Sequence, residues 1–226
     1  MRTVWIPSLN SQNPELTART RLRNAAIECF AIDGFDVSVR TIASRAAVSA
    51  GLVRHHFGSK ELLREECDGA VLGTLRDLKS AAVGMPTGQL MDLLARAEEY
   101  GGLLLYILRS VRDGGSGGRA FLEHMIADAQ EYTQKGVDAG LLKPSQDPEA
   151  RVRYLVMEGV GGMIVALSGY PHITMENFST IMAEIMAAVT LPRLELYSQG
   201  LFADTTVFDE YLLATGRVAR PASTQS

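Results

Sequence analysis

The apolar residues of this chain recur at helical spacing along almost its entire length, whereas alternating β-branched residues are scarce. The first such stretch runs from about residue 15 to residue 33, and its apolar stripe includes Leu22 and Phe30. Gly34 follows in the position that a C-cap glycine takes at the end of a helix. The pattern therefore predicts an opening helix that begins at about Glu15 or Thr17 and ends at Asp33.

Three serines mark the starts of further helices, because a serine hydroxyl at the N-cap accepts a hydrogen bond from a backbone N–H of the first turn. Ser38 precedes a short helix over 39–46, Ser49 begins another that reaches about Phe57, and Ser59 precedes a longer one. These signals predict two short helices and one long helix after the first.

Glycine and proline divide the rest of the chain at "VGMPTG", "DGGSGG", "GLLKPSQDP" and "GYPHIT". Pro192 is expected to kink or interrupt the helix in which it lies. No internal repeat is present. The helices predicted after Ser59 cover about 60–80, 87–112, 118–139, 147–169, 174–200 and 205–215.

The predicted fold is all-α, with an N-terminal three-helix head that contains a helix-turn-helix and a larger helical body. We expect a flexible N-terminal arm over residues 1–14, the head over 15–62, the body over 63–216 and a frayed tail over 217–226. The arm carries Arg2 and Trp5, which either reach along DNA or belong to a disordered tail.

Composition indicates a soluble globular protein, with 46% hydrophobic and 21% charged residues. Two cysteines make a disulfide framework improbable and fit a reducing compartment. The first residues contain Pro7 and Pro14 instead of a continuous apolar stretch, and no apolar run reaches the roughly 20 residues that span a bilayer. We therefore expect a cytoplasmic protein.

Charge is distributed unevenly along the chain. Residues 1–60 hold eight Lys and Arg against four Asp and Glu, whereas the rest holds fourteen against twenty-two. A basic head on an acidic body favours contact between the head and a polyanion. The alternative is a chance imbalance, so the arrangement of the basic residues has to decide.

The two short helices, separated by residues 46–49, have the spacing of a helix-turn-helix. Val53 and Phe57 lie four residues apart and share the face that is expected to pack inward. Arg54 and the two histidines that follow it are left on or beside the opposite face. Phosphate contact, a metal site, catalysis and a merely solvated charged face would all use such side chains.

His55 and His56 point about 100° apart on a helix, so they cannot bind one metal ion as an i, i+4 pair would. No Cys or acid nearby completes a ligand set, and a small protruding helix offers no pocket for a catalytic base. We therefore predict no metal, no catalytic residue and no cofactor. Contact with nucleic acid and a solvated face stay as the alternatives.

Contact with DNA suits the side chains that are present. Arg and His donate hydrogen bonds to phosphates and base edges, and Gly51 permits a close approach. Leu52 is suited to a thymine methyl group. Lys60 stands at the start of the next helix, where backbone N–H groups can hold a phosphate. Arg40 and Thr41 begin the preceding helix and are expected near the flanking backbone.

The segment "GFDVSVRTIASRAAVSAGLVRHHFGSKELL" resembles the DNA-binding domain of the TetR family of bacterial transcriptional regulators. The resemblance covers about residues 15–65, and the rest of the chain is similar in the number and order of its helices. The matching features are Gly34–Phe35, Ile42–Ala43, Ala47–Gly51, His55, Phe57, Lys60 and Leu62.

The resemblance implies a homodimer whose recognition helices enter successive major grooves of a near-palindromic double-stranded DNA operator, and release of that DNA when a small molecule binds in the body. The chain departs from the family at Leu52, Arg54 and His56, so base preferences are not transferred. The family's contacts fall on Thr41, Gly51, Arg54, His55, His56 and Lys60, to which we add Arg40, Arg45, Ala50 and Leu52.

In the body, polar groups stand among apolar residues, as a small-molecule site requires. Nine methionines indicate adaptable packing. The alternative for each of the residues named below is that it belongs to the hydrophobic core. The resemblance to the TetR family is the main reason to expect a pocket here. The candidate ligand-binding residues are Tyr100, Leu104, Tyr106, Arg109, Phe121, His124, Met125 and Met157.

The segment "EGVGGMIVALSG" places glycines inside a predicted helix, where each costs about 1 kcal/mol relative to alanine. Such glycines are tolerated where another helix packs very close. The resemblance places a four-helix dimer interface on this segment and the next helix, and an intramolecular contact is the alternative. The candidate interface residues are Gly159, Gly161, Gly162, Met163, Leu167, Phe178, Ile181, Met182, Ile185 and Val189.

The interpretation that accounts for the head and the body together is a DNA-binding regulator, which we predict to be a repressor released by a small-molecule ligand. The alternatives are a helical protein-interaction module and an enzyme with a helix-turn-helix-like head. Against the enzyme, the chain contains no HExxH, GxSxG, Gly-rich phosphate loop or Cys/His cluster.

Overall fold

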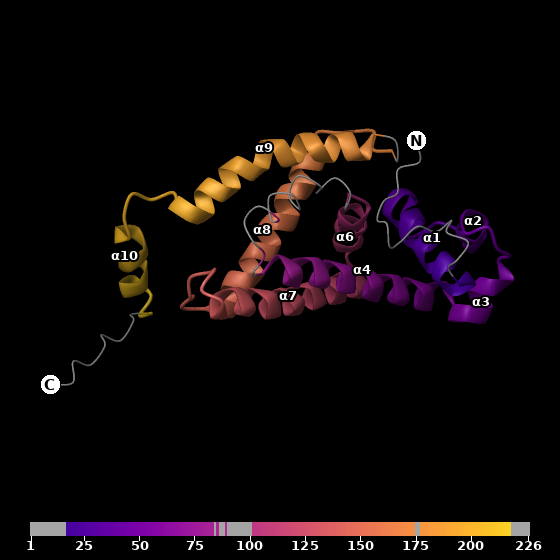
Figure 1. The fold of residues 1–226 in the computed structure, drawn as a ribbon, viewed down its shortest axis with the longest axis horizontal. Helices are drawn as coiled ribbons and strands as arrows, with labels where there is room; N and C mark the ends of the chain where they lie inside the picture. The colour runs from indigo at the N-terminus through magenta and orange to yellow at the C-terminus, as the bar shows by residue number, and fades with distance from the viewer. Residues whose placement is uncertain (1–16, 84, 86–88, 90–100, 175–176, 218–226) are drawn as a thin grey trace. The chain divides into compact units, whose positions relative to one another are not determined.

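The computed structural model describes residues 17–83, 85, 89, 101–174 and 177–217, and within these ranges the chain forms helices joined by turns, without a strand (Figure 1). The all-α prediction is confirmed. The chain forms two compact units, Met1–Ala183 and Glu184–Ser226. The predicted arm, the tail after Arg217 and Tyr100 lie outside the described residues.

The head consists of α1 (Ala18–Asp33), α2 (Val39–Arg45) and α3 (Gly51–Phe57). The Thr17 hydroxyl accepts a hydrogen bond from the Thr20 N–H at 3.2 Å, and the Ser38 hydroxyl accepts one from the Thr41 N–H at 3.1 Å. Ser38 is therefore the predicted N-cap of α2. Gly34 ends α1 with a φ of 90°, a conformation that favours glycine.

The turn between α2 and α3 is short, and Ala47 adopts a φ of 55° within it. α3 begins at Gly51 and not at Ser49, and its N-cap residue is Ala50, whose methyl group makes no capping hydrogen bond. Val53 and Phe57 are buried, as predicted, and so are Ile42 and Leu22. These side chains join the three short elements into a helix-turn-helix with its own core.

The body begins with α4 (Lys60–Ala82), whose predicted N-cap is confirmed because the Ser59 hydroxyl accepts a hydrogen bond from the Leu62 N–H at 3.2 Å. It continues with α6 (Gly101–Asp113), α7 (Gly115–Asp138) and α8 (Pro148–Ser168). α7 runs alongside α4 and packs on α6 and α8, and α1 packs on α6 and α4 (Figure 1). Head and body therefore share one compact unit up to Ala183.

An aromatic cluster fills the contact between head and body. Phe30 and Phe35 of the head lie 5.2 Å apart, and Phe35 meets Tyr106 of α6 edge-on at 5.8 Å between ring centroids. Tyr106 lies 6.3 Å from Phe121 of α7. An edge-to-face pair such as Phe35–Tyr106 adds about 0.5–1.5 kcal/mol beyond the area that it buries, so the cluster fastens α1 to the body.

The last two helices are α9 (Phe178–Gln199) and α10 (Thr206–Ala214). Pro192 lies inside α9, and the predicted interruption at this residue does not occur. A proline lacks the N–H that would bond to the carbonyl four residues earlier. That carbonyl belongs to Ala188, which is exposed, so water can satisfy it. Within the described part of the chain, none of the helices combines the length and the apolar content needed to cross a bilayer.

Candidate nucleic-acid interface

The two faces of α3 differ in burial. Val53 and Phe57 face the core of the head, whereas Gly51, Arg54 and His55 are exposed. A side chain added at Gly51 would meet no atom within 4 Å, so the backbone of α3 is open to a close approach at this residue. The exposed face of α3 therefore carries cationic and hydrogen-bonding side chains, and its first residue has no side chain.

Arg19 of α1 fixes the carboxyl end of α3. Its Nη1 donates a hydrogen bond to the His56 carbonyl oxygen, and its guanidinium lies 4.6 Å from the centroid of the Phe57 ring. Its Nη2 also pairs with the Glu66 carboxylate of α4 at 2.8 Å. The sequence did not predict these contacts of Arg19, because Arg19 is far from α3 in the chain and no local pattern indicates them.

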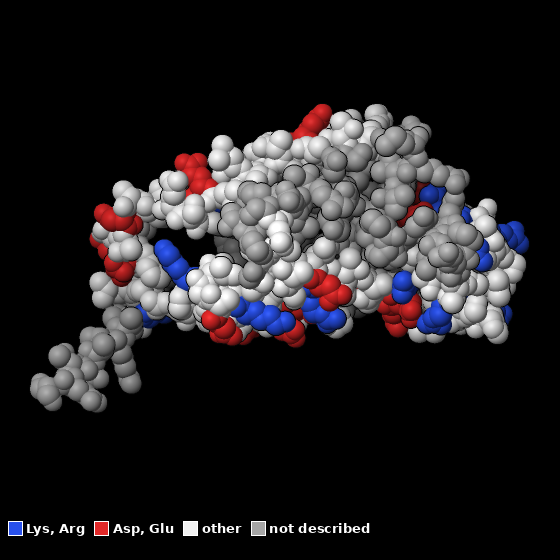
Figure 2. All heavy atoms as spheres, viewed as in Figure 1, with Lys and Arg blue, Asp and Glu red and all other residues white. Residues whose placement is uncertain are grey.

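Other predicted contact residues surround α3. Arg40 and Thr41 are exposed in the first turn of α2, and Lys60, the first residue of α4, is half-buried. Figure 2 shows several basic side chains on the head, at the right of the view, whereas basic and acidic side chains are mixed along the body. The exposed start of α2, the exposed face of α3 and the start of α4 thus bring the predicted residues together.

Besides Lys60, four of the predicted residues are less accessible. Ala50, Leu52 and His56 are half-buried. Arg45 is half-buried as well, and its Nη1 lies 3.6 Å from an Oε atom of Glu28, so it joins α2 to α1. The rings of His55 and His56 lie 5.0 Å apart between centroids, with an interplanar angle of 67°. Among the described residues, no group of three or more His, Cys, Asp or Glu side chains is placed to hold a metal ion.

Known proteins share both parts of this chain. The family described as "Bacterial regulatory proteins, tetR family" matches residues 22–67, and the one described as "Tetracyclin repressor-like, C-terminal domain" matches residues 98–203. The HTH-type transcriptional regulatory protein RaaS of Mycobacterium tuberculosis is 41% identical over 203 residues, which cover 89% of this chain and 94% of that protein. The chain belongs to the TetR family. It is a helix-turn-helix transcriptional regulator, and the family is one of DNA-binding regulators and not of enzymes.

Two further TetR-family comparisons agree with this assignment. The HTH-type transcriptional regulator UidR of Escherichia coli is 44% identical over 55 residues, 24% of this chain and 28% of that protein. The crystal structure of the TetR family transcriptional regulator PfmR from Thermus thermophilus superposes with a TM-score of 0.50 at 20% identity, covering 84% of this chain and all of that one. The second likeness concerns the fold alone.

In this TetR-family regulator, two arginines make polar contacts between head and body. Arg109 of α6 donates hydrogen bonds from Nε to the Ala31 carbonyl at 3.1 Å and from Nη2 to the Ile32 carbonyl at 2.6 Å, both in the last turn of α1. The guanidinium of Arg64 on α4 lies 3.5 Å from the centroid of the Phe35 ring and pairs with Asp113 at 2.8 Å. Both arginines therefore hold the end of α1 and the turn that follows it.

Tyr106 makes a polar contact within the body, between α6 and α4, beside this joint between head and body. Its hydroxyl donates a hydrogen bond to an Oδ of Asp68 on α4 at 2.7 Å. Burial raises the pKa of Tyr106 well above its usual value, and burial also raises the pKa of Asp68, although the hydrogen bond from Tyr106 opposes that second shift. Tyr106 therefore keeps the proton that it donates in this bond.

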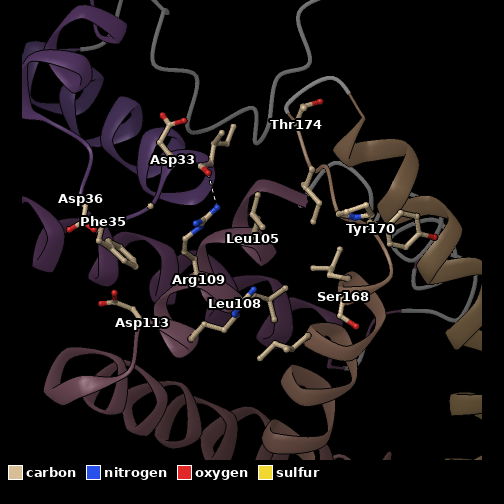
Figure 3. A pocket seen from close by; sticks show the side chains of 17 residues that line it. Asp33, Phe35, Asp36, Leu105, Leu108, Arg109, Asp113, Ser168, Tyr170 and Thr174 are labelled. Atoms are coloured by element: carbon tan, nitrogen blue, oxygen red, sulfur yellow. Dashed lines mark hydrogen bonds between the residues drawn. The ribbon is translucent and has the colours of Figure 1, made fainter.

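A cavity of about 770 Å³ lies beside the joint (Figure 3). Its walls come from the end of α1 and the following turn, from α6, and from the end of α8 and the turn before α9. Of the predicted ligand-binding residues, Arg109 lines it. Tyr106, Phe121 and Met125 are buried in the core, and Leu104 is half-buried. His124 and Met157 are exposed.

The predicted dimer residues divide into two groups. Met163, Leu167, Phe178, Ile181, Met182 and Ile185 are each at most 9% exposed in the single chain. These side chains are covered within the single chain and offer a partner little surface, and their part in a dimer stays a prediction.

The glycines of α8 behave differently, since a side chain added at Gly159, Gly161 or Gly162 would meet no atom within 4 Å. The close helix contact predicted at these glycines is thus not made within the described residues. Val189 is half-buried. The exposed face of α8 instead carries Tyr154, Met157 and Val165, at 66%, 58% and 71% exposure. The sequence did not single out Tyr154 and Val165, and Met157 was predicted in the ligand site. Helical periodicity does not say which of two apolar faces is covered within the chain.

Proposed function

We propose that this regulator is a repressor that binds a near-palindromic operator as a homodimer and leaves it when a small molecule binds. The observation that carries the DNA-binding part is the exposed face of α3, on which Gly51, Arg54 and His55 stand opposite a buried face. Homodimers and small-molecule effectors are typical of the TetR family, and they supply the rest of the proposal.

The exposed residues of this surface and the half-buried Lys60 each have a role in this proposal. Arg54 and Lys60 contact phosphates, since both are cationic and lie at the end of α3 and the start of α4. Gly51 lets the backbone approach base edges, and His55 donates hydrogen bonds to them. Thr41 contacts the flanking backbone.

The less accessible residues contribute at the rim, where Leu52 meets a thymine methyl group. Arg40 lies with Thr41 at the flank of the groove. Arg45 acts through its ion pair with Glu28, which fixes α2. Ala50 and His56 lie at the edge of the contact with DNA and make no hydrogen bond to it. We also propose a cytoplasmic location, which the free thiols of the buried Cys29 and Cys67 support.

Mobility shifts with DNA test the proposal. Genomic fragments that the full-length protein retains are sequenced first, and the best fragment then serves as probe at two salt concentrations. Affinity should fall steeply with salt, because bound phosphates release counterions. A protein-interaction module or an enzyme would retain no fragment.

Arg54→Ala and Lys60→Ala are the decisive variants. Each should weaken binding to all sequences alike and reduce the slope of log affinity against log salt by about 1. Arg119→Ala and Lys135→Ala remove exposed cations of the same kinds from α7 and should bind like the wild type. Unchanged binding by both head variants would place the DNA on another surface.

A further inference from the structure

The cavity beside the joint has one wall made by a single face of α6. Leu105, Leu108, Arg109 and Arg112 line it, at the i, i+3, i+4 and i+7 positions that share one side of a helix. Ile164 and Leu167, near the end of α8, also line the cavity. The space therefore combines an apolar lining with two arginines that stand three residues apart on α6.

The two arginines have hydrogen-bonding capacity to spare. Arg109 uses Nε and Nη2 on the carbonyls of α1, which leaves its Nη1 without a hydrogen bond among the described residues. Arg112 is exposed and forms no ion pair within the described part of the chain. Two like charges at i, i+3 repel each other, and an anion between them would relieve that repulsion. The hydroxyl of Ser168 already donates to the Val165 carbonyl, so the arginines are the stronger donors of this wall.

The carboxylates of the cavity lie toward the head. Asp113 is neutralised by Arg64 at 2.8 Å. Asp33 and Asp36 are exposed, and in Figure 3 they stand with Phe35 on the side of Arg109 that faces away from Ser168. The region between α6 and the end of α8 is therefore the part of the cavity that an anion can occupy.

We propose that this cavity is an effector site for a small organic anion with an apolar body, and that Arg109 transmits its occupancy to α1. The anionic group binds Arg112 and Arg109, and the apolar body lies against Leu105, Leu108, Ile164 and Leu167. The regulatory part of this inference rests on the proposed function, because it requires DNA affinity that a ligand controls.

The route to the head is short. Arg109 is the residue whose guanidinium both lines the cavity and caps the last carbonyls of α1 (Figure 3). An anion that draws this guanidinium toward itself competes with the Ala31 and Ile32 carbonyls. The end of α1 then loses two hydrogen bonds to the body, and α1 carries Arg19, which holds α3. Occupancy of the cavity thereby shifts the head away from its DNA-binding arrangement.

Two dyes with the same aromatic body test the site. 8-Anilinonaphthalene-1-sulfonate carries an anionic group, and N-phenyl-1-naphthylamine lacks it. Arg112→Gln should raise the Kd of the sulfonate about tenfold and leave that of the neutral dye unchanged. Arg119→Gln, which removes an exposed arginine from α7, should alter neither. An equal loss for both dyes would overturn the recognition of an anion.

A second variant locates the dye. Ile164→Trp fills the cavity and should weaken both dyes at least tenfold, whereas Ala127→Trp adds the same ring on an exposed position of α7 and should weaken neither. Circular dichroism checks that each variant is folded. If Ile164→Trp and Arg112→Gln both bind the sulfonate like the wild type, the dye binds elsewhere and the assignment of the cavity as its site is wrong.

The link to DNA is measured with the fragment selected above. A saturating concentration of the sulfonate should lower the DNA affinity of the wild type at least about fivefold, the lower end of typical coupling, and should have no effect on Ile164→Trp. Arg109→Gln should lower DNA affinity without dye. Dye binding that leaves DNA affinity unchanged would overturn the transmission through Arg109. Failure to retain any genomic DNA would contradict the proposed function instead. The Kd values of the two dyes for the variants would still show whether the cavity binds an anion.

Discussion

Tyr106 and Asp68 form a partly buried hydrogen bond under the contact between head and body. The carboxyl group comes from α4 and the hydroxyl from α6, and their atoms lie 2.7 Å apart. Burial disfavours the charged form of each group, which is why the pKa of both is raised. The stability of the joint therefore depends on pH through Asp68.

The sign of that dependence follows from linkage. The folded state binds the Asp68 proton more tightly than the unfolded chain, so its contribution to stability is full at low pH and is lost as pH rises through the raised pKa. Asp68→Asn keeps an acceptor for Tyr106 and does not ionise. We expect this variant to gain stability relative to the wild type between about pH 4 and about pH 7, as measured by urea unfolding. Glu65→Gln, at an exposed position of α4, is the control. The same difference at both pH values would show that Asp68 titrates normally.

The two cysteines provide a second test of burial. Cys29 and Cys67 are fully buried, and burial raises the pKa of Cys29 to about 11 and that of Cys67 well above its usual value. The thiolate is the reactive form, so neither thiol should react with Ellman's reagent in the folded protein. Both should react at once after unfolding in guanidinium. Rapid labelling of either thiol in the native protein would mean that the packing of α1 against α4 opens locally.

The helices of this protein depend on each other at their ends. The carbonyls at the end of α1 are satisfied by Arg109 from α6. α7 begins at Gly115, three residues before the predicted start at 118, although its first turn is rich in glycine. A close crossing explains these glycines, because a side chain added at Gly118 would lie 2.6 Å from the Ser110 carbonyl oxygen. Tertiary contact, more than helix propensity, therefore fixes the start of α7.

Adjacent glycines allow this to be tested. Gly118→Ala forces α7 away from α6 and should lower the free energy of unfolding by about 1–3 kcal/mol. Gly117→Ala places the same methyl group on an exposed position, where the nearest atom is 3.8 Å away. It should raise stability by up to about 1 kcal/mol, because alanine favours a helix over glycine. Thermal and urea unfolding measure both variants, and equal effects would remove the close crossing as the reason for Gly118.

At the scale of the whole molecule, the single chain leaves a large apolar surface uncovered. Besides Tyr154 and Val165 on α8, the unit Glu184–Ser226 exposes many large apolar side chains, among them Leu191 at 73% and Leu201 at 80%. Large apolar side chains that stay exposed within a single chain often mark a surface that another molecule covers. A second copy of the chain is the partner that the TetR family favours, and the exposed face of α8 is where we place part of the contact.

Gly162→Leu tests that placement. A side chain at Gly162 meets nothing within the protomer, and leucine favours a helix, so the fold of each chain should be kept. We expect the Kd of the dimer to rise at least about tenfold, with a matching loss of specific DNA binding. Sedimentation velocity measures the dimer, and Ala127→Leu on α7 is the control. A variant that stays as dimeric as the wild type would move the interface off this face of α8.

Most of the fold could be predicted because its signals are local. Ser38, Ser59 and Gly34 each bond or bend within a few residues of their own position, and they end or begin helices where predicted. The start of α3 was misplaced by two residues, since Ser49 looks like an N-cap but does not act as one. The candidate site followed from the same local pattern, because the burial of Val53 and Phe57 leaves Arg54 and His55 outside.

By itself, the sequence determined the helices, the helix-turn-helix and the face of α3 that meets solvent, because each depends on spacing within a few turns of one helix. Only the tertiary structure decided which residues hold the head to the body. Arg19, Arg64 and Arg109 each act on a partner from a distant part of the chain. It also decided that the apolar stripe of Met163 and Leu167 is internal while Val165 is outside. An apolar residue has the same character in either place, and only the packing of other helices against it fixes which face is covered.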